Sequence, residues 1–198
     1  MKKVMFFSCI ALMAIVSFVS CKDNNGGEDT NAPDILLQET FDEGIPSTWT
    51  LIDADGDKKT WWASYGVSFE TPPGNGGTDC ALSESFSNDM MSALKPDNYM
   101  VTPAIEVPNA TYTLTWYVAA SDPEFPADKY SVYAGTLEGG KFSPIGDALH
   151  TEVISSGDFQ KRSVSLEAYK GQTIYIAFRH YDCTDEFMMK LDDVMIMK

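Results

Sequence analysis

The stretch Thr111-Tyr112-Thr113-Leu114-Thr115-Trp116-Tyr117-Val118 decides the fold of this chain. Its apolar and polar side chains alternate, which places Tyr112, Leu114, Trp116 and Val118 on one face and the threonines and Tyr117 on the other. Successive side chains of a β-strand point to opposite faces of the sheet. The alternation therefore predicts a strand that buries one face in a core.

The same alternation recurs along the chain. Residues 172–178 place Ile174, Ile176 and Phe178 on one face, and residues 130–134 repeat the pattern. Gly, Pro, Asp and Asn separate such segments every 8–15 residues, and only short pieces at 87–94 and 166–169 suit helical turns. Because many short strands with turn-rich connections are typical of two packed sheets, we predict an all-β, jelly-roll β-sandwich of two antiparallel sheets.

Length, composition and charge limit the function. The 198 residues suffice for one domain of ordinary size, and 12% aromatic residues argue against a disordered chain. The formal net charge is −15, with 29 acidic and 14 basic residues. Nucleic acid is therefore excluded as a default partner, because no basic stripe exists to neutralise phosphates. The acidic balance suits divalent cations or a well-solvated surface.

The first residues read as a secretion signal. Lys2 and Lys3 precede an apolar run at 4–19, which is short for a membrane span and ordinary for a signal peptide. The sequence Val19-Ser20-Cys21 resembles the cleavage box of bacterial lipoproteins, in which the cysteine is acylated. We therefore expect a signal peptide over 1–20, a lipidated Cys21 with a flexible tether over 21–37, and one domain over 38–198.

The expected location follows from this signal. A lipidated Cys21 predicts an outer-membrane lipoprotein, since several acyl chains make a stable anchor. Lys22-Asp23 resembles the acidic export tags of surface lipoproteins, which favours display at the cell surface.

Two cysteines remain in the body of the chain, Cys80 and Cys183. Outside the cytoplasm such thiols tend to pair, and a bridge would close a loop of about 100 residues and add about 4–5 kcal/mol in the chain-entropy view. The alternative is two buried free thiols. The sequence does not supply the Cα separation that a bridge requires, so both alternatives stay open.

The acidic loop Asp53-Ala54-Asp55-Gly56-Asp57 is the sharpest local signal. Three carboxylates at alternate positions, bent by a glycine, can turn their oxygens toward one point, as Ca²⁺ requires. The loop is no EF-hand, because the twelfth position from Asp53 is Ser64 instead of a bidentate acid. The alternative is an ordinary Asp/Gly turn between strands.

A second acidic pair, Asp192-Asp193, lies between Leu191 and Val194 in the last expected strand. Adjacent strand residues face opposite ways, so one carboxylate is expected to point to the core side. A buried carboxylate must be paired, hydrogen-bonded or bound to metal. We therefore expect a cation here, shared with Glu39 or Asp42.

Two further groups of residues bear on function. Trp61 and Trp62 are adjacent on an expected strand, so one of them should face outward, where a flat aromatic ring can stack on a sugar; the alternative is that both pack under loops. His180 precedes Asp182 and Asp185, so a catalytic His–Asp pair is conceivable, and the 29 acidic residues also offer pairs for glycoside hydrolysis, as any chain this acidic does. The sequence contains no Gly-x-Ser-x-Gly, His-Glu-x-x-His or P-loop motif, so a structural histidine is the favoured interpretation.

Six blocks of sequence, in order, resemble the cleaved adhesin domains of the gingipain proteases and haemagglutinins. They are FDEGIPSTW at 41–49, IDADGD at 52–57 before Trp61, LKPDNYMVTP at 94–103, FPADKYSVY at 125–133, and IAFRHYDCTD at 176–185 with LDDV at 191–194. The resemblance extends over residues 38–198.

This resemblance implies a calcium-binding jelly roll that acts in adhesion rather than catalysis. It implies Asp53, Asp55, Asp57, Asp192 and Asp193 as calcium ligands. The gingipain modules are tandem parts of a large secreted polyprotein, whereas one copy is expected here on a lipid anchor. Their known ligands therefore transfer poorly.

Together these observations predict a non-catalytic, calcium-stabilised adhesion lipoprotein that binds a host or matrix protein or a glycan. A carbohydrate-binding module for glycan capture is the first alternative, and a hydrolase using His180 is the second.

Overall fold

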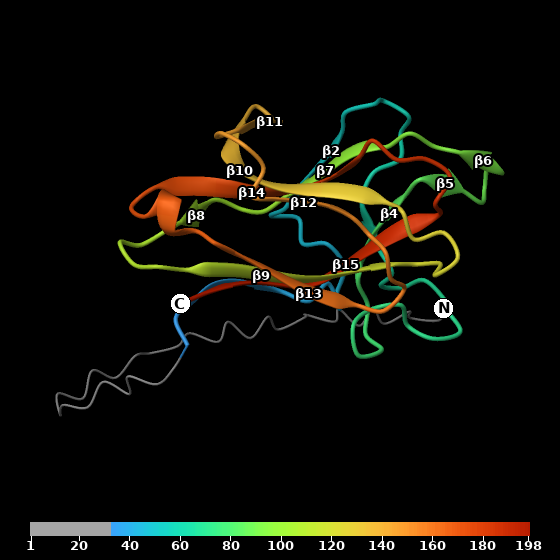
Figure 1. Cartoon of the computed structure of the whole chain (residues 1–198), viewed down its shortest axis with the longest axis horizontal. Helices are drawn as coiled ribbons and strands as arrows, with labels where there is room; N and C mark the ends of the chain where they lie inside the picture. Colours follow the sequence, from blue (N-terminus) through green and yellow to red (C-terminus); the bar gives the residue numbers. More distant parts are fainter. Residues whose placement is uncertain (1–32) are drawn as a thin grey trace, which may run out of the picture. The chain divides into compact units, whose positions relative to one another are not determined.

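The computed structural model describes residues 33–198, and these residues form two antiparallel sheets packed face to face (Figure 1). The first sheet contains β1 (Ile35–Glu39), β3 (Trp62–Ala63), β4 (Ala81–Glu84), β9 (Thr113–Ala120), β13 (Gln160–Ser165) and β15 (Met188–Met197). The second contains β2 (Thr50–Asp53), β7 (Asp97–Val101), β8 (Ile105–Glu106), β10 (Lys129–Glu138), β11 (Lys141–Pro144), β12 (His150–Val153) and β14 (Thr173–Tyr181). A small hairpin of β5 (Phe86–Ser87) and β6 (Ser92–Ala93) and a 3₁₀ turn, η1 (Glu167–Tyr169), complete the described elements.

The strand order confirms the predicted jelly-roll β-sandwich. The first sheet runs β13-β9-β15-β4-β3, and β1 pairs with the other end of β15. The second runs β11-β10-β14-β7-β2, with β12 on β10 and β8 on β14. Figure 1 shows β10 and β14 in one layer and β9 and β13 in the other. Several connections, such as β9 to β10 and β12 to β13, cross from one layer to the other, so loops from distant parts of the chain meet at the ends of the sandwich.

The core lies between the sheets and follows the predicted alternation. Tyr112, Leu114, Trp116 and Val118 are buried on the inner face of β9, and Ile174, Ile176 and Phe178 are buried on β14. The rings of Trp116 and Phe178 meet edge to face across the two sheets, 5.9 Å between centroids. Burying each such side chain contributes about 1.5–3 kcal/mol, and this apolar layer holds the sandwich together.

Two local predictions were wrong. Strand β1 begins at Ile35, so the tether expected to reach residue 37 ends before that strand; Leu36 and Leu37 pack on the core. The piece at 87–94 is the β5–β6 hairpin instead of a helical turn, whereas η1 lies within the predicted turn at 166–169. The signal peptide, Cys21 and most of the tether lie outside the described residues. Within residues 33–198, no helix is long and apolar enough to cross a membrane.

Candidate functional site

The acidic loop at the end of β2 brings its three carboxylates together. One oxygen each of Asp53, Asp55 and Asp57 lies within 4.8 Å of the others. Gly56, with φ +78°, allows the sharp bend. Backbone N–H groups already donate to these oxygens, among them those of Gly56 to Asp53 Oδ1 at 2.7 Å and of Lys58 to Asp53 Oδ2 at 2.9 Å. The loop therefore presents a preformed cluster of oxygen ligands.

The neighbouring carboxylates of this loop differ in their acidity. Partial burial acts to raise the pKa of Asp53, but the N–H donors of Lys58 and Gly56 outweigh it and lower that pKa. Burial raises the pKa of Asp55, and the adjacent Asp53 carboxylate adds to the effect. Asp55 Oδ2 also accepts the backbone N–H of Asp97 at 2.7 Å, which fixes the loop to β7. Two like charges thus share one small volume, and a cation would relieve their repulsion.

A second acidic cluster surrounds Asp192 in β15. Asp192 is fully buried. Leu191 and Val194 on either side belong to the apolar core, but Asp192 does not. Asp192 pairs with the half-buried Tyr117 of β9, and paired residues share a face, so its carboxylate lies on the outer face of the first sheet. There it accepts the backbone N–H of Asn75 at 2.8 Å. The prediction that one carboxylate of the pair points to the core side is wrong: Asp192 is buried on the outer face, beneath the loop that carries Asn75.

A break in β15 brings Asp193 to the same place. The register with β9 shifts between Asp192 and Met195, and Asp193 has φ +48°, so the regular alternation of faces is interrupted. Asp193 Oδ2 accepts the side-chain N–H of Asn75 at 2.8 Å. One asparagine therefore contacts both carboxylates.

Glu39 ends β1 beside β15, and Asp42 follows in the next connection. Glu39 pairs with Val194 across the sheet and accepts the N–H of Phe41 at 2.8 Å. Asp42 accepts the N–H of Asp79, at the far end of the loop that carries Asn75. Burial, followed by the nearby charges of Asp193 and Asp42, raises the pKa of Asp192 to about 7. No Lys or Arg among the described residues forms an ion pair with these acids.

The expected tryptophan platform is wrong for Trp61. Its side chain is 1% exposed and donates its indole N–H to the carbonyl of Asn98 at 3.1 Å, so it is a core residue. Trp62 is half-buried on the outer face, where it packs on Cys80, Leu82 and Met188. The Trp61 ring is therefore closed to a sugar, whereas Trp62 faces outward with part of its surface exposed, as expected of one of the pair.

Both cysteines of the body are free, so the disulfide alternative is wrong. Cys80 is packed in the small apolar cluster beneath Trp62, whereas Cys183 lies beside His180 in the connection after β14. The two thiols therefore belong to different environments. Burial raises the pKa of each to about 12.

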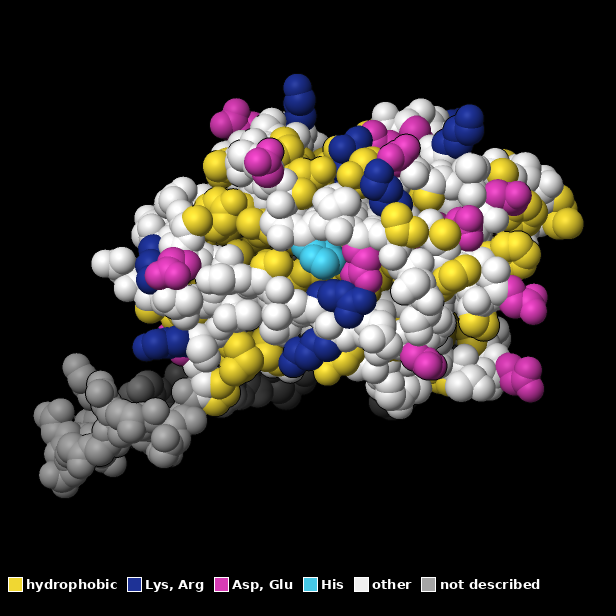
Figure 2. All heavy atoms as spheres, viewed as in Figure 1, with side chains coloured by type: hydrophobic (Ala, Val, Ile, Leu, Met, Phe, Trp, Pro, Cys, Tyr) yellow, Lys and Arg dark blue, Asp and Glu magenta, His cyan; other side chains and the backbone are white. Residues whose placement is uncertain are grey.

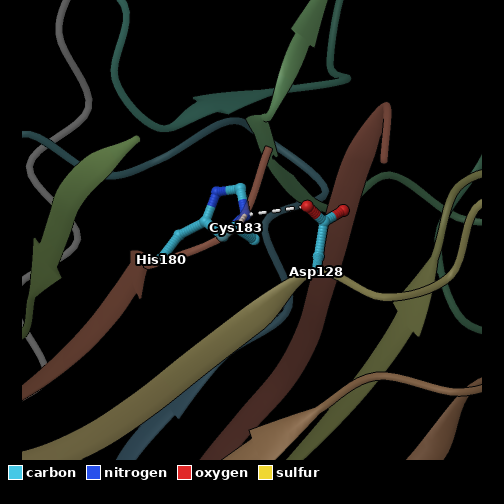
Figure 3. Close-up of side chains that lie close together, drawn as sticks. All are labelled: Asp128, His180 and Cys183. Carbon is cyan, nitrogen blue, oxygen red and sulfur yellow. Dashed lines mark hydrogen bonds and ion pairs between the residues drawn. The ribbon is translucent and has the colours of Figure 1, made fainter. Parts of the chain in front are cut away.

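The arrangement around His180 does not support a hydrolase. His180 is fully buried and pairs with Asp128 rather than with Asp182 or Asp185. Asp128 Oδ1 and Cys183 Sγ both approach the same ring nitrogen, Nε2, at 3.0 and 3.1 Å (Figure 3). Ser83 Oγ lies 2.8 Å from the other nitrogen, Nδ1. Ser83 and Asp128 take opposite ring nitrogens, as the nucleophile and the acid of a triad do. Both are fully buried together with His180, however, so a substrate has no access to the Ser83 hydroxyl.

The sequence reasoning missed a cleft at one end of the sandwich. Phe86, Phe125 and Phe187 line a space of about 400 Å³ together with Asn88, Asp122 and Asp185. Figure 2 shows apolar side chains reaching the surface at the end that carries β5 and β6. Only the apolar residues in turn-rich segments, such as Phe125 after Asp122-Pro123, signalled it in the sequence.

Two stacked antiparallel sheets with acidic clusters and an apolar cleft in their loops define a β-sandwich module of the ligand-binding kind. The family described as Cleaved Adhesin Domain matches residues 34–196, and the chain belongs to that family. The resemblance seen in the sequence is thereby confirmed.

Individual relatives agree with this assignment. Hemagglutinin A of Porphyromonas gingivalis is 36% identical over 188 residues, which cover 87% of this chain but only 7% of that protein. The K1 cleaved adhesin domain of Lys-gingipain from P. gingivalis W83 superposes with a TM-score of 0.70 at 35% identity, covering 81% of this chain and 96% of the other. The CBM22-2 xylan-binding domain of Paenibacillus barcinonensis Xyn10C shares the fold alone, with a TM-score of 0.52 at 9% identity over 82% and 98% of the two chains.

Proposed function

We propose that this protein is a non-catalytic, calcium-stabilised adhesion module that binds a host or matrix protein or a glycan at the bacterial surface. The family match over residues 34–196 is the observation that carries the proposal. A lipid on Cys21 would hold the module on the outer membrane, as the lipoprotein-like Val19-Ser20-Cys21 sequence indicates.

The two acidic clusters are the proposed calcium sites. Ca²⁺ takes six to eight oxygen ligands from carboxylates, carbonyls and water. Asp53, Asp55 and Asp57 would supply the first site, and Asp192 and Asp193 with Glu39 and Asp42 the second. The first site is supported by geometry, because its three carboxylates bring oxygens within 4.8 Å of one another. The second is supported by burial, because an ionised carboxylate buried beside other acids needs a compensating cation. Bound calcium would tie β1, the 74–79 loop and β15 together.

A thermal melt of the full chain in detergent, in calcium and then in EDTA, tests this stabilisation. Calcium at one hundred times its dissociation constant adds about 2.7 kcal/mol per site, which raises the melting temperature by about 5–10 °C for a chain of this size. Asp55→Asn and Asp192→Asn should each remove part of the rise, and Asp147→Asn, an exposed acid outside both clusters, should leave it intact. An unchanged melt after exhaustive chelation would contradict the calcium sites.

Glycan binding in the apolar cleft is the second candidate function. Phe125 is 50% exposed, and the carboxylates of Asp122 and Asp185 and the amide of Asn88 surround the three phenylalanines. Flat rings for stacking beside a few polar groups suit a sugar. Phe187, with φ +92°, and Asp185, with φ +66°, hold strained backbone at the rim of the cleft, and such strain clusters at ligand sites.

Calorimetric titration with soluble xylan and other polysaccharides tests the cleft. Phe125→Ala should abolish any binding that the wild type shows. Phe69→Ala, which removes another exposed phenylalanine outside the cleft, should leave it unchanged. Binding that survives Phe125→Ala would place the sugar elsewhere and favour a different surface.

A further inference from the structure

Three potential metal ligands converge at one end of the second sheet, where β2 and β7 separate them from the acidic loop of Asp53, Asp55 and Asp57. His180 lies near the end of β14, Cys183 follows in the next connection, and Asp128 immediately precedes β10, which pairs with β14. One ligand atom from each lies within 4.8 Å of the other two. Figure 3 shows the imidazole edge turned toward Asp128, with Cys183 beside it.

The chemistry of these ligands differs from that of the calcium sites. Thiolate, imidazole and carboxylate together are typical of Zn²⁺, whereas Ca²⁺ prefers oxygen alone. We propose that Asp128, His180 and Cys183 form a binding site for a zinc-like divalent transition metal. Three protein ligands leave one tetrahedral position for water.

The distances fit such an ion after a small adjustment. His180 Nε2 lies 3.0 Å from Asp128 Oδ1 and 3.1 Å from Cys183 Sγ. Tetrahedral zinc, with bonds of about 2.0–2.1 Å to nitrogen and oxygen and about 2.3 Å to sulfur, separates its ligands by about 3.3–3.6 Å. Each of these two pairs therefore needs to open by a few tenths of an ångström, and Asp128 and Cys183 already lie within 4.8 Å of each other.

The buried charge of Asp128 is the second, independent observation. Asp128 is fully buried, and its Oδ2 atom has no hydrogen-bond partner. A buried carboxylate with an unsatisfied oxygen is costly unless a counter-charge is present. A divalent ion would neutralise the Asp128 carboxylate and the Cys183 thiolate together, and the thiol proton would leave to solvent.

The surroundings orient the ligands and give an ion access. Ser83 Oγ lies 2.8 Å from His180 Nδ1, so that nitrogen can donate its proton to the hydroxyl while Nε2 faces the ion. Cys183 is partly exposed and lines a groove of about 510 Å³ with Lys95, Asp97 and Arg179. An ion can reach the site from this groove.

Cobalt titration of the full chain in detergent, after removal of metals, tests the site. Co²⁺ is the probe because thiolate ligation gives a charge-transfer band in the near ultraviolet. We expect one such band per chain that Zn²⁺ abolishes by displacement. Cys183→Ser should remove it, and Cys80→Ser, which changes the other thiol of the body, should leave it. Ser83 is a positioning residue, because its hydroxyl holds His180 Nδ1. Ser83→Ala should therefore weaken Co²⁺ affinity about 10- to 100-fold.

A band that is missing from the wild type, or that persists unchanged in Cys183→Ser, would overturn the proposal. Alkylation of the folded wild type followed by peptide mapping gives a second readout that does not depend on a variant folding. Zn²⁺ should slow the labelling of the partly exposed Cys183, whereas the fully buried Cys80 should stay unlabelled with and without Zn²⁺. Equal labelling of Cys183 with and without Zn²⁺ would also overturn it. Asp55→Asn should keep the cobalt band, so failure of the calcium sites is distinguishable from failure of this one.

Discussion

Asp192 is the residue at which burial and charge conflict most. Its folded pKa is raised to about 7, chiefly by burial, whereas an unfolded aspartate titrates near 4. Between these values the folded state holds more protons than the unfolded state, so this group lowers the free energy of unfolding as the pH rises. We predict that, in EDTA, wild type loses more stability between pH 4 and pH 7 than Asp192→Asn does, measured by chemical denaturation.

The comparison uses slopes because Asp192 accepts backbone N–H groups from Asn75 and Asp193, and Asn replaces one acceptor with a donor. That loss shifts the free energy of unfolding of the variant by the same amount at every pH, so the slopes of the two proteins against pH can still be compared. Calcium should reverse the trend in wild type, since it binds the ionised carboxylate. Parallel slopes for the two proteins in EDTA would show that Asp192 titrates normally.

Individual residues show where sequence reasoning stops. The Asp53, Asp55 and Asp57 cluster was predictable, because all its ligands lie within five residues. The pairing of His180 with Asp128, 52 residues apart, depends on β10 and β14 being neighbours, which no local pattern states. Trp61 and Trp62 were ambiguous for a similar reason: alternation separates two faces, but the cover on each face comes from distant strands.

At the scale of elements, an ion-pair network joins the two sheets at one edge. Glu152 of β12 accepts from Arg162 Nε of β13 at 2.8 Å and from the hydroxyl of Tyr130 at 3.0 Å, and it contacts His150 Nε2 at 2.9 Å. Partial burial opposes ionisation, but the hydrogen bonds from Arg162, His150 and Tyr130 prevail and lower the Glu152 pKa to about 2. This carboxylate therefore links β12 in one layer to β13 in the other.

We predict that Glu152→Gln lowers the free energy of unfolding by about 1–3 kcal/mol at pH 7, as for loss of a charged hydrogen-bond partner. The depressed folded pKa makes this contribution present above pH 4.5 and lost as the pH falls toward 2. Denaturant melts should therefore show wild type and variant converging in acid. Glu138→Gln is the control, because Glu138 is exposed and forms no ion pair among the described residues. A gap between wild type and Glu152→Gln that stays constant from pH 7 to pH 2.5 would contradict the network.

The loop over Asp192 depends on a glycine at its start. A Cβ atom at Gly74 would lie 2.3 Å from the carbonyl oxygen of Asp79 and 2.5 Å from that of Thr78, so the loop must open to admit it. We predict that Gly74→Ala destabilises the protein and also reduces the rise in melting temperature on adding calcium, because Asn75 and Asp79 would move away from the second acidic cluster.

Gly135→Ala is the matched control for Gly74→Ala. A Cβ at Gly135 would meet Phe142 and the carbonyl of Ser143 at 2.4 Å, an equal crowding on the opposite sheet. This variant should lose about 1–3 kcal/mol through overpacking and keep the full calcium response. An equal loss of the calcium response in both variants would show that general destabilisation, and not the loop, is responsible.

Element boundaries and faces differ in how far the sequence determines them. The alternation at 112–118 and 174–178 predicted the inner faces of β9 and β14 correctly. In a strand every second side chain shares a face, so once the apolar face is known, the side on which each residue lies is fixed. The break in β15 at Asp192–Met195 was not predictable from that period, since an irregularity in register shows only where a partner strand is present. That break brings Asp192 and Asp193 to one cluster.

At the scale of the whole molecule, the excess of negative charge opposes the compact state. With 29 acidic against 14 basic residues, repulsion between carboxylates outweighs attraction in ion pairs, and exposed ion pairs contribute only about 0–1 kcal/mol each. Screening acts over about 30 Å at 10 mM salt and about 8 Å at 150 mM, so added salt should weaken the repulsion most.

We predict that raising NaCl from about 10 to about 150 mM in EDTA increases the melting temperature of the full chain by a few °C, because long-range repulsion is lost before buried pairs such as Arg162–Glu152 are screened. With calcium bound, the same salt step should increase it less, since two divalent ions have already removed four charges from the excess of 15. KCl should act like NaCl, because the effect is screening and not ion binding. A melting temperature that falls with salt in EDTA would mean that attractive pairs dominate the electrostatic energy, and the calcium response would then need to come from local ligation alone.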